Sequence, residues 1–256
     1  MRFKTFTLAA ASAAICLSAC TTQRYAVTGV ERSRILVDSR YDSKIPQSDI
    51  NFLAPYKATV DSLMSPVMGV AAHEMTVGRP ESELSNLLAD ILVWSSSEFG
   101  EKPDFAVYNI GGIRASLSEG NVTKGDILDV APFENKICFL TLSGNDVTEL
   151  FGNIASVGGE GVSHGVSLVI DRNSHKLVSA TVNGKPVDPD ASYRIATLDY
   201  LAQGNDKMVA FKKKTQVVSP KAEENNVRFL IEKYFQNATH EGKKVTSRIE
   251  GRIVIK

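Results

Sequence analysis

The chain has few of the residues that build metal sites and disulfide frameworks. Three cysteines and four histidines occur among its 256 residues. No HExxH, CxxC or Asp-x-His motif brings such side chains together. We therefore expect no metal site and no hydrolytic metal centre within these residues. A disulfide framework is also excluded, and Cys138, which lies in a strand-like run, is expected to be a buried and unreactive thiol.

Net charge and long apolar runs are lacking as well. Lysine and arginine together number 29, and so do aspartate and glutamate, which leaves a net charge of zero. A protein that grips a nucleic-acid backbone shows a basic excess, so nucleic-acid polymers are not expected partners. Small nucleotides are not excluded, because one or two local arginines suffice for them. The apolar run at residues 6–17 is too short to span a bilayer as a helix.

That apolar run has the features of an export signal. Arg2 and Lys4 precede it, and the tetrad Leu-Ser-Ala-Cys closes it at residues 17–20. A positive start, a short apolar core and small residues before the cleavage site are typical of a secretory signal peptide. A cysteine directly after Leu-Ser-Ala is the lipobox pattern, in which the thiol of Cys20 is acylated and becomes the mature N-terminus. We expect an exported protein, anchored by lipid to the bacterial cell envelope; an ordinary signal peptide with a nearby cysteine is the alternative.

Local patterns divide the chain and predict its elements. We expect a signal peptide at residues 1–19, a polar tether and lead-in segment at 20–54, and one folded domain at 55–256. Helices are predicted at residues 55–65, after Ser82, at 143–156 and at 223–235. Strands are predicted at residues 104–108, 127–130, 136–142, 166–171, 177–182, 193–197 and 252–256, the fourth and fifth forming a hairpin. This mixture indicates an α+β fold, with mostly antiparallel, mixed sheets flanked by helices.

Three clusters carry residues suited to a ligand, and the first follows the strand predicted at 104–108. It contains Asn109, Gly111, Gly112 and Arg114. Two glycines let the backbone turn sharply and approach a ligand closely. The planar guanidinium of Arg114 suits a carboxylate or a phosphate. The alternative is an ordinary tight turn with a surface arginine.

The other two clusters each present an aromatic side chain. Pro132 makes a rigid bend that presents Phe133, either as core filling or as a stacking platform. Tyr200 follows a predicted strand, and Asp206 lies six residues further on. A carboxylate beside an aromatic face suits a nucleoside, because the base stacks and the ribose hydroxyls donate hydrogen bonds. An ordinary loop, in which Asp206 caps its own backbone, is the alternative.

Taken in order, these motifs resemble the C-terminal, substrate-binding domain of the 5′-nucleotidase family. That family carries N-G-G-G-I-R, I-T, V-x-P-F-x-N, L-T-G and F-x-A-x-G-G-D in this sequence order. The matching segments are residues 109–114, 122–123, 130–135, 142–144 and 198–206. Residues 83–90 also look like the family's L-G-N-L-x-x-D helix. The resemblance extends from about residue 75 to residue 206.

The resemblance assigns ligand roles to the residues of the three clusters. Two aromatic rings would sandwich the base, an amide and a guanidinium would hold the ligand beside the glycine turn, and a carboxylate would engage the ribose. The residues are, in that order, Phe133 and Tyr200, then Asn109 and Arg114 with Gly111 and Gly112 in the turn, and Asp206.

Several positions depart from the family motifs. Ser85, Ile110 and Asn205 stand where the family has glycine, and Tyr200 stands where phenylalanine is usual. A family arginine that precedes the helix is displaced by one position here, to Arg79.

Family enzymes also place a two-metal phosphoesterase domain ahead of this one, where the metals activate water. Nothing in these 256 residues resembles it. The resemblance therefore implies the nucleotide- or nucleoside-recognition half of an extracytoplasmic 5′-nucleotidase-type phosphohydrolase, inactive alone and without catalytic residues or a cofactor. A separate metallophosphatase chain would carry the divalent metals and cleave the phosphate, in nucleotide catabolism. Two alternatives remain: a lipid-anchored nucleoside- or nucleotide-binding protein, and a scaffold whose pocket has decayed.

Overall fold

The computed structural model describes residues 25–36, 38–40 and 45–256. The expected signal peptide at 1–19 and the lipid-bearing Cys20 lie outside these residues. The contacts between residues divide the chain after Phe52 into two units, residues 1–52 and residues 53–256. The domain boundary at residue 55 stays a prediction.

Helix α2 (Gln47–Met64) is longer than the helix predicted at 55–65. Pro55, which was expected to begin the helix, lies inside it. The helix therefore includes residues 47–54, which belong to the segment predicted as tether and lead-in. The helix ends at Met64, shortly before Pro66, as the sequence predicts.

Two amphipathic helices, α3 (Glu83–Ser95) and α5 (Gly144–Ser156), are confirmed. Each begins after a serine whose hydroxyl accepts a hydrogen bond from the backbone N–H three residues further on. In α3 the N–H of Ser85 donates to the hydroxyl of Ser82 at 3.2 Å. The Ser85 hydroxyl in turn accepts from the backbone N–H of Ser82, which completes a capping box. Serine in place of the family glycine thus strengthens the start of α3.

A five-stranded sheet forms the centre of residues 53–256, in the order β10-β4-β9-β2-β5. Its strands are β2 (Phe105–Tyr108), β4 (Ile137–Ser143), β5 (Gly161–Val162), β9 (Ser192–Leu198) and β10 (Thr215–Val218). β4 and β9 pair antiparallel over seven residues, while β2 runs parallel to β9. The ring of Phe151 on α5 packs on Phe105 of β2, with centroids 5.4 Å apart. The hydrophobic core therefore lies between this sheet and its helices.

Two smaller sheets flank the central one. The first pairs β1 (Val67–Ala71) with β3 (Gly120–Thr123), and the second has the order β11-β6-β7-β8. Its strands are β6 (Val166–Ile170), β7 (Leu177–Val182), β8 (Lys185–Pro186) and β11 (Ile253–Ile255). β6 and β7 form the predicted antiparallel hairpin. The turn that follows has positive φ at Asn183 and Gly184, the conformation that an Asn-Gly pair favours.

One predicted strand is wrong. Residues 127–130 lie in helix α4 (Lys124–Val130), which Thr123 and Asp126 begin with a capping box. Residues 127–130 hold three apolar side chains and Asp129, a segment too short to distinguish a strand from a buried helical turn, so the cap was the informative signal. The helix predicted at 223–235 is α7 (Val227–His240), preceded by the short 3-10 turn η5 (Glu223–Asn225).

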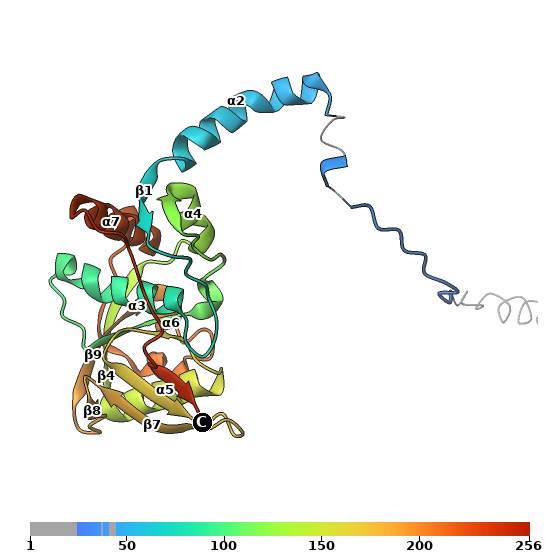
Figure 1. The fold of residues 1–256 in the computed structure, drawn as a ribbon. Helices are drawn as coiled ribbons and strands as arrows, with labels where there is room; N and C mark the ends of the chain where they lie inside the picture. The colour runs from blue at the N-terminus through green and yellow to red at the C-terminus, as the bar shows by residue number, and fades with distance from the viewer. Residues whose placement is uncertain (1–24, 37, 41–44) are drawn as a thin grey trace, which may run out of the picture. The chain divides into compact units, whose positions relative to one another are not determined.

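The remaining elements are short. They are η2 (Ser96–Phe99), η3 (Ile110–Gly112), α6 (Asp199–Ala202) and η4 (Val209–Lys213). Figure 1 shows α7 and α4 beside β1 at one end of residues 53–256, and β7, β8 and the C-terminus at the other. No helix among the described residues is long and apolar enough to cross a membrane. The α+β architecture of mixed, mostly antiparallel sheets with flanking helices is confirmed.

Candidate functional site

The glycine turn begins where β2 ends. Asn109 directly follows the strand and is 4% exposed, and η3 supplies the three residues after it. A Cβ atom on Gly112 would lie 2.7 Å from Oδ1 of Asn109, so only glycine fits there while Asn109 keeps its place. At Gly111 the nearest atom is Oδ2 of Asp206, 3.9 Å from such a Cβ. The turn thus fixes an amide side chain and leaves open space in front of it.

Asp206 is held against this turn from two sides. Nδ2 of Asn109 donates a hydrogen bond to Oδ2 of Asp206 at 2.8 Å, across 97 residues of sequence. The hydroxyl of Tyr200 donates to Oδ1 at 2.9 Å, and this bond raises the pKa of Tyr200. Both carboxylate oxygens therefore have a donor, which fixes the orientation of the group. A carboxylate offers about four lone-pair sites, so acceptor capacity remains for a ligand.

The loop that carries Asp206 is stabilised by its own side chains. Asp206 has φ of 51°, in the left-handed region that aspartate tolerates better than most residues. Nδ2 of Asn205 donates to the backbone oxygen of Tyr200 at 2.9 Å. Asparagine in place of the family glycine therefore adds a hydrogen bond inside the loop.

These groups surround a cavity of about 200 Å³. It is lined by Asn109, Gly111, Gly112, Phe133, Asn135, Tyr200 and Asp206. The two aromatic side chains are partly exposed, Phe133 to 49% and Tyr200 to 36%. The structure thus brings together six of the seven ligand-binding residues predicted from the sequence. Asn135 was not among them, although it lies in the V-x-P-F-x-N segment two residues after Phe133.

Arg114, the seventh predicted residue, does not line this cavity. Its side chain is exposed, and its Nη1 atom lies 3.5 Å from the backbone oxygen of Gly111 in the same turn. Its role toward a ligand stays a prediction.

A buried ion pair contacts the glycine turn, and the sequence motifs indicated only its arginine, Arg79, and not its carboxylate. Glu160 is 2% exposed. Its Oε2 accepts a hydrogen bond from the backbone N–H of Ile110 at 2.5 Å, and its Oε1 accepts from Nη2 of Arg79 at 2.7 Å. Burial raises the pKa of Glu160 to about 7, and the charge of Asp206 adds to the rise, while Ile110 and Arg79 oppose it.

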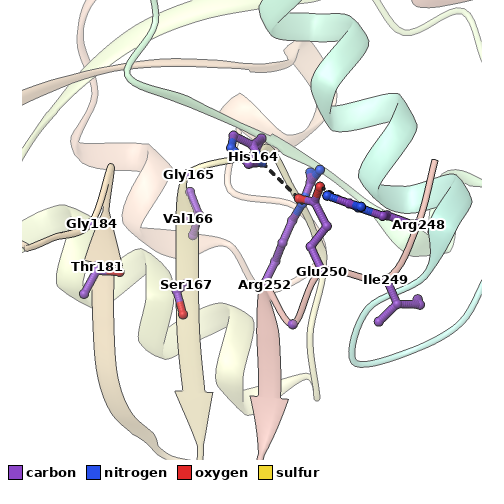
Figure 2. A pocket seen from close by; sticks show the side chains of 11 residues that line it. His164, Gly165, Val166, Ser167, Thr181, Gly184, Arg248, Ile249, Glu250 and Arg252 are labelled. Carbon is purple, nitrogen blue, oxygen red and sulfur yellow. Dashed lines mark hydrogen bonds and ion pairs between the residues drawn. The ribbon is translucent and has the colours of Figure 1, made fainter. Parts of the chain in front are cut away.

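A larger cavity, of about 620 Å³, lies beside β6 and the segment before β11 (Figure 2). Its charged side chains are paired with one another. Glu250 accepts from Nδ1 of His164 and from Nε of Arg252, both at 3.0 Å, and Arg248 lies 3.6 Å away. Arg252, 5% exposed, also forms a bidentate pair with Asp90. These groups hold the C-terminal segment in place and offer little unpaired charge to a ligand.

Two further observations limit the chemistry of the described residues. Among residues 25–36, 38–40 and 45–256, no group of three or more His, Cys, Asp or Glu side chains is arranged to hold a metal ion. Cys138 is buried, and its burial raises the pKa of the thiol, so it is poorly suited to act as a nucleophile.

Comparison with known families identifies the family of the fold, and the matched range includes the smaller cavity. The model of the 5′-nucleotidase C-terminal domain matches residues 66–213, which include every residue that lines the smaller cavity. This chain belongs to the 5′-nucleotidase C-terminal domain family. The resemblance seen in the sequence motifs is therefore confirmed at the level of the family.

Individual relatives of this 5′-nucleotidase-family chain are considerably longer. Protein UshA of Yersinia enterocolitica is 31% identical over 176 residues, which cover 65% of this chain and 31% of UshA. Cell wall protein Lmo0130 of Listeria monocytogenes is 26% identical over 239 residues, covering 84% of this chain and 30% of Lmo0130. The 5′-nucleotidase precursor of Thermus thermophilus superposes with a TM-score of 0.68 at 27% identity, over 79% of this chain and 42% of that one. The chain thus spans less than half the length of each.

Proposed function

We propose that this chain binds the base and ribose of a nucleoside or nucleotide, while a separate metallophosphatase chain cleaves the phosphate. The observation that carries the proposal is the smaller cavity. It combines two partly exposed aromatic rings, two amide side chains and a carboxylate that is oriented in advance. An aromatic stacking surface and a hydroxyl acceptor in one small site match the base and the ribose of a nucleoside.

Each part of a nucleoside has a matching group in this cavity. The base stacks against Phe133 and Tyr200, a contact worth about 1–3 kcal/mol. The ribose hydroxyls donate to the lone pairs of Asp206 that Asn109 and Tyr200 leave unused. The side-chain hydrogen bond of Asn205 supports an intact pocket rather than a decayed one, because this substituted residue stabilises the loop that carries Asp206.

The charge of the cavity supports a phosphate position outside it. Asp206 is the one charged side chain among the seven lining residues, so a phosphate inside would meet like charge. Arg114 lies next to the turn, outside the lining, where its guanidinium can contact a phosphate. A phosphate outside the pocket is accessible to a partner's metals, which would activate water and stabilise the transition state.

The proposed location is outside the cytoplasm, with Cys20 as the lipid anchor. The export signal of the sequence supports this, and so does the name of one relative, a cell wall protein. An anchored chain is confined to the membrane surface, which raises its effective concentration for a partner held at the same surface.

The stacking role is tested by calorimetry with adenosine and AMP. Phe133→Ala and Tyr200→Ala are each expected to weaken binding by roughly 5- to 150-fold, the loss of one stacked face. Phe229→Ala is the matched control, since this partly buried phenylalanine lies on α7 outside the cavity. Unchanged affinity in both cavity variants would overturn the assignment.

The division of labour is tested by phosphate release from AMP. The purified chain alone is expected to release none, with or without divalent metal. Release is expected when a metallophosphatase partner and the metal are added together. If binding is measured but no partner increases turnover, the chain is a binding protein; rapid hydrolysis by the chain alone would contradict the proposal.

A further inference from the structure

The smaller cavity depends on a residue that does not line it. Glu160 precedes β5 and lies behind the turn formed by η3, with both carboxylate oxygens bound to N–H donors. One donor is the guanidinium of Arg79, and the other is the backbone of Ile110, which adjoins Asn109. Glu160 therefore contacts the turn without lining the ligand space.

Tight packing holds the backbone next to Glu160 against the segment that follows Arg79. A Cβ atom on Gly159 would lie 2.3 Å from the backbone oxygen of Pro80, so the two chain segments touch without room for a side chain. Nη1 of Arg79 also donates a hydrogen bond to the backbone oxygen of Gly159. Arg79 thus binds both the carboxylate and the backbone that carries it.

We propose that Glu160, held by Arg79, is a positioning residue for ligand binding: it fixes the Ile110 amide, and with it the turn that carries Asn109. Asn109 in turn orients the carboxylate of Asp206. The inference rests on the proposed function, because positioning matters only if the cavity takes a ligand. The path from Arg79 to Asp206 consists of hydrogen bonds of 2.5–2.8 Å joined by one stretch of backbone.

The hold on the turn varies with pH. The charged groups that act on Glu160 are Arg79, from the segment before α3, and Asp206, from the loop after α6. Its pKa of about 7 means that the carboxyl group changes charge near neutral pH. An ionised carboxylate accepts hydrogen bonds more strongly than a neutral one. The hydrogen bond from the Ile110 amide to Glu160 is therefore stronger above pH 7 than below it.

A ligand-free experiment tests the hydrogen bond between Glu160 and the Ile110 amide. The full-length chain is labelled with ¹⁵N-isoleucine in mild detergent, and the Ile110 amide signal is assigned by its loss in Ile110→Val. We expect the chemical shift of this signal to change between pH 5.5 and 8.5 with a midpoint near 7. In Glu160→Gln we expect no such change. A signal that does not titrate, or that titrates equally in both chains, overturns the proposal.

The second experiment measures the affinity for adenosine, which stays uncharged over this pH range. The unmodified chain is expected to bind about threefold more tightly at pH 8 than at pH 6. Glu160→Gln is expected to bind about threefold to tenfold more weakly at pH 8, with no pH dependence.

Glu101→Gln is the matched control, because it breaks the ion pair with Arg194, whose partners do not line the cavity. It is expected to lower the melting temperature but to keep the pH profile of binding. The same pH profile in Glu160→Gln and the unmodified chain overturns the positioning role. If the unmodified chain binds no adenosine at all, the proposed function falls, while the amide titration still decides whether Glu160 holds the turn.

Discussion

The smaller and the larger cavity differ in what their polar groups already do. In the larger one, Glu250 is surrounded by His164, Arg248 and Arg252, so its charge is satisfied within the protein (Figure 2). In the smaller one, Asp206 is oriented by two neutral donors and keeps acceptor capacity beside exposed aromatic faces. The larger volume is thus a structural junction, and the smaller one has the features of a ligand site. Polar groups with free hydrogen-bonding capacity therefore indicate function better than the volume of a cavity does.

The largest expected effect is a loss of stability, caused by a substitution beside the larger cavity. Arg252→Met removes the buried partner of Asp90 and leaves that carboxylate without its ion pair, while Glu250 keeps His164 and Arg248, at a cost of about 3–5 kcal/mol in the free energy of unfolding. Urea denaturation measures this loss. Adenosine affinity of the folded fraction is expected to stay within threefold. A parallel loss of affinity would break the comparison, because the two cavities would then act as one region.

The next effect concerns the glycine turn. Gly112→Ala places a methyl group 2.7 Å from Oδ1 of Asn109, and is expected to destabilise the fold by about 1–3 kcal/mol while displacing Asn109. Gly111→Ala, one residue earlier, meets nothing closer than 3.9 Å and is the control for stability. Thermal melting and adenosine titration distinguish them. Equal stability of the two variants would contradict the packing described for the turn.

The smallest effect sharpens the comparison through pH, because one carboxylate in each region titrates abnormally. The folded pKa of Glu160 is raised from its ordinary value near 4.5 to about 7, so its contribution is full below about 4.5 and is lost as pH rises through 7. The pKa of Glu250 is lowered, first by His164 and then by Arg252, so its contribution is present above about 4.5 and is lost as pH falls through the lower folded pKa.

Denaturation across pH 3–9 checks these opposite signs. Glu160→Gln is expected to remove the loss of stability toward pH 7 and above, and Glu250→Gln the loss below pH 4.5. The two variants are thus distinguished by the limb of the stability profile that each one changes. If both variants changed the same limb of the profile, the two environments would not differ as described.

Local signals in the sequence predicted the elements that are stabilised locally. The serine caps and periodic leucines located α3, and the alternation before Asn183 and Gly184 located the β6–β7 hairpin. The strand predicted at 127–130 was wrong because four residues are too few to show a helical or strand period, and the cap at Thr123 decides the outcome.

The site was predictable where motifs exist and not elsewhere. The proximity of Asn109 and Asp206 follows from the family motifs, since no local pattern connects residues so far apart in sequence. Glu160 belongs to none of those motifs, and its contact with Arg79 depends on the packing of Gly159 against Pro80. Such pairs become visible only when the chain is folded.

The separation of these partners has a consequence for how the pocket comes into being. Arg79 meets Glu160 across 81 residues, and Asn109 meets Asp206 across 97. Contacts of such high sequence separation form late, because a long loop must close before they contribute. During synthesis no pocket exists until residue 206 has left the ribosome, whatever the earlier segments have built. Ligand binding by this chain would therefore indicate that the native topology has formed. A chain that ends before residue 206 would not bind the ligand.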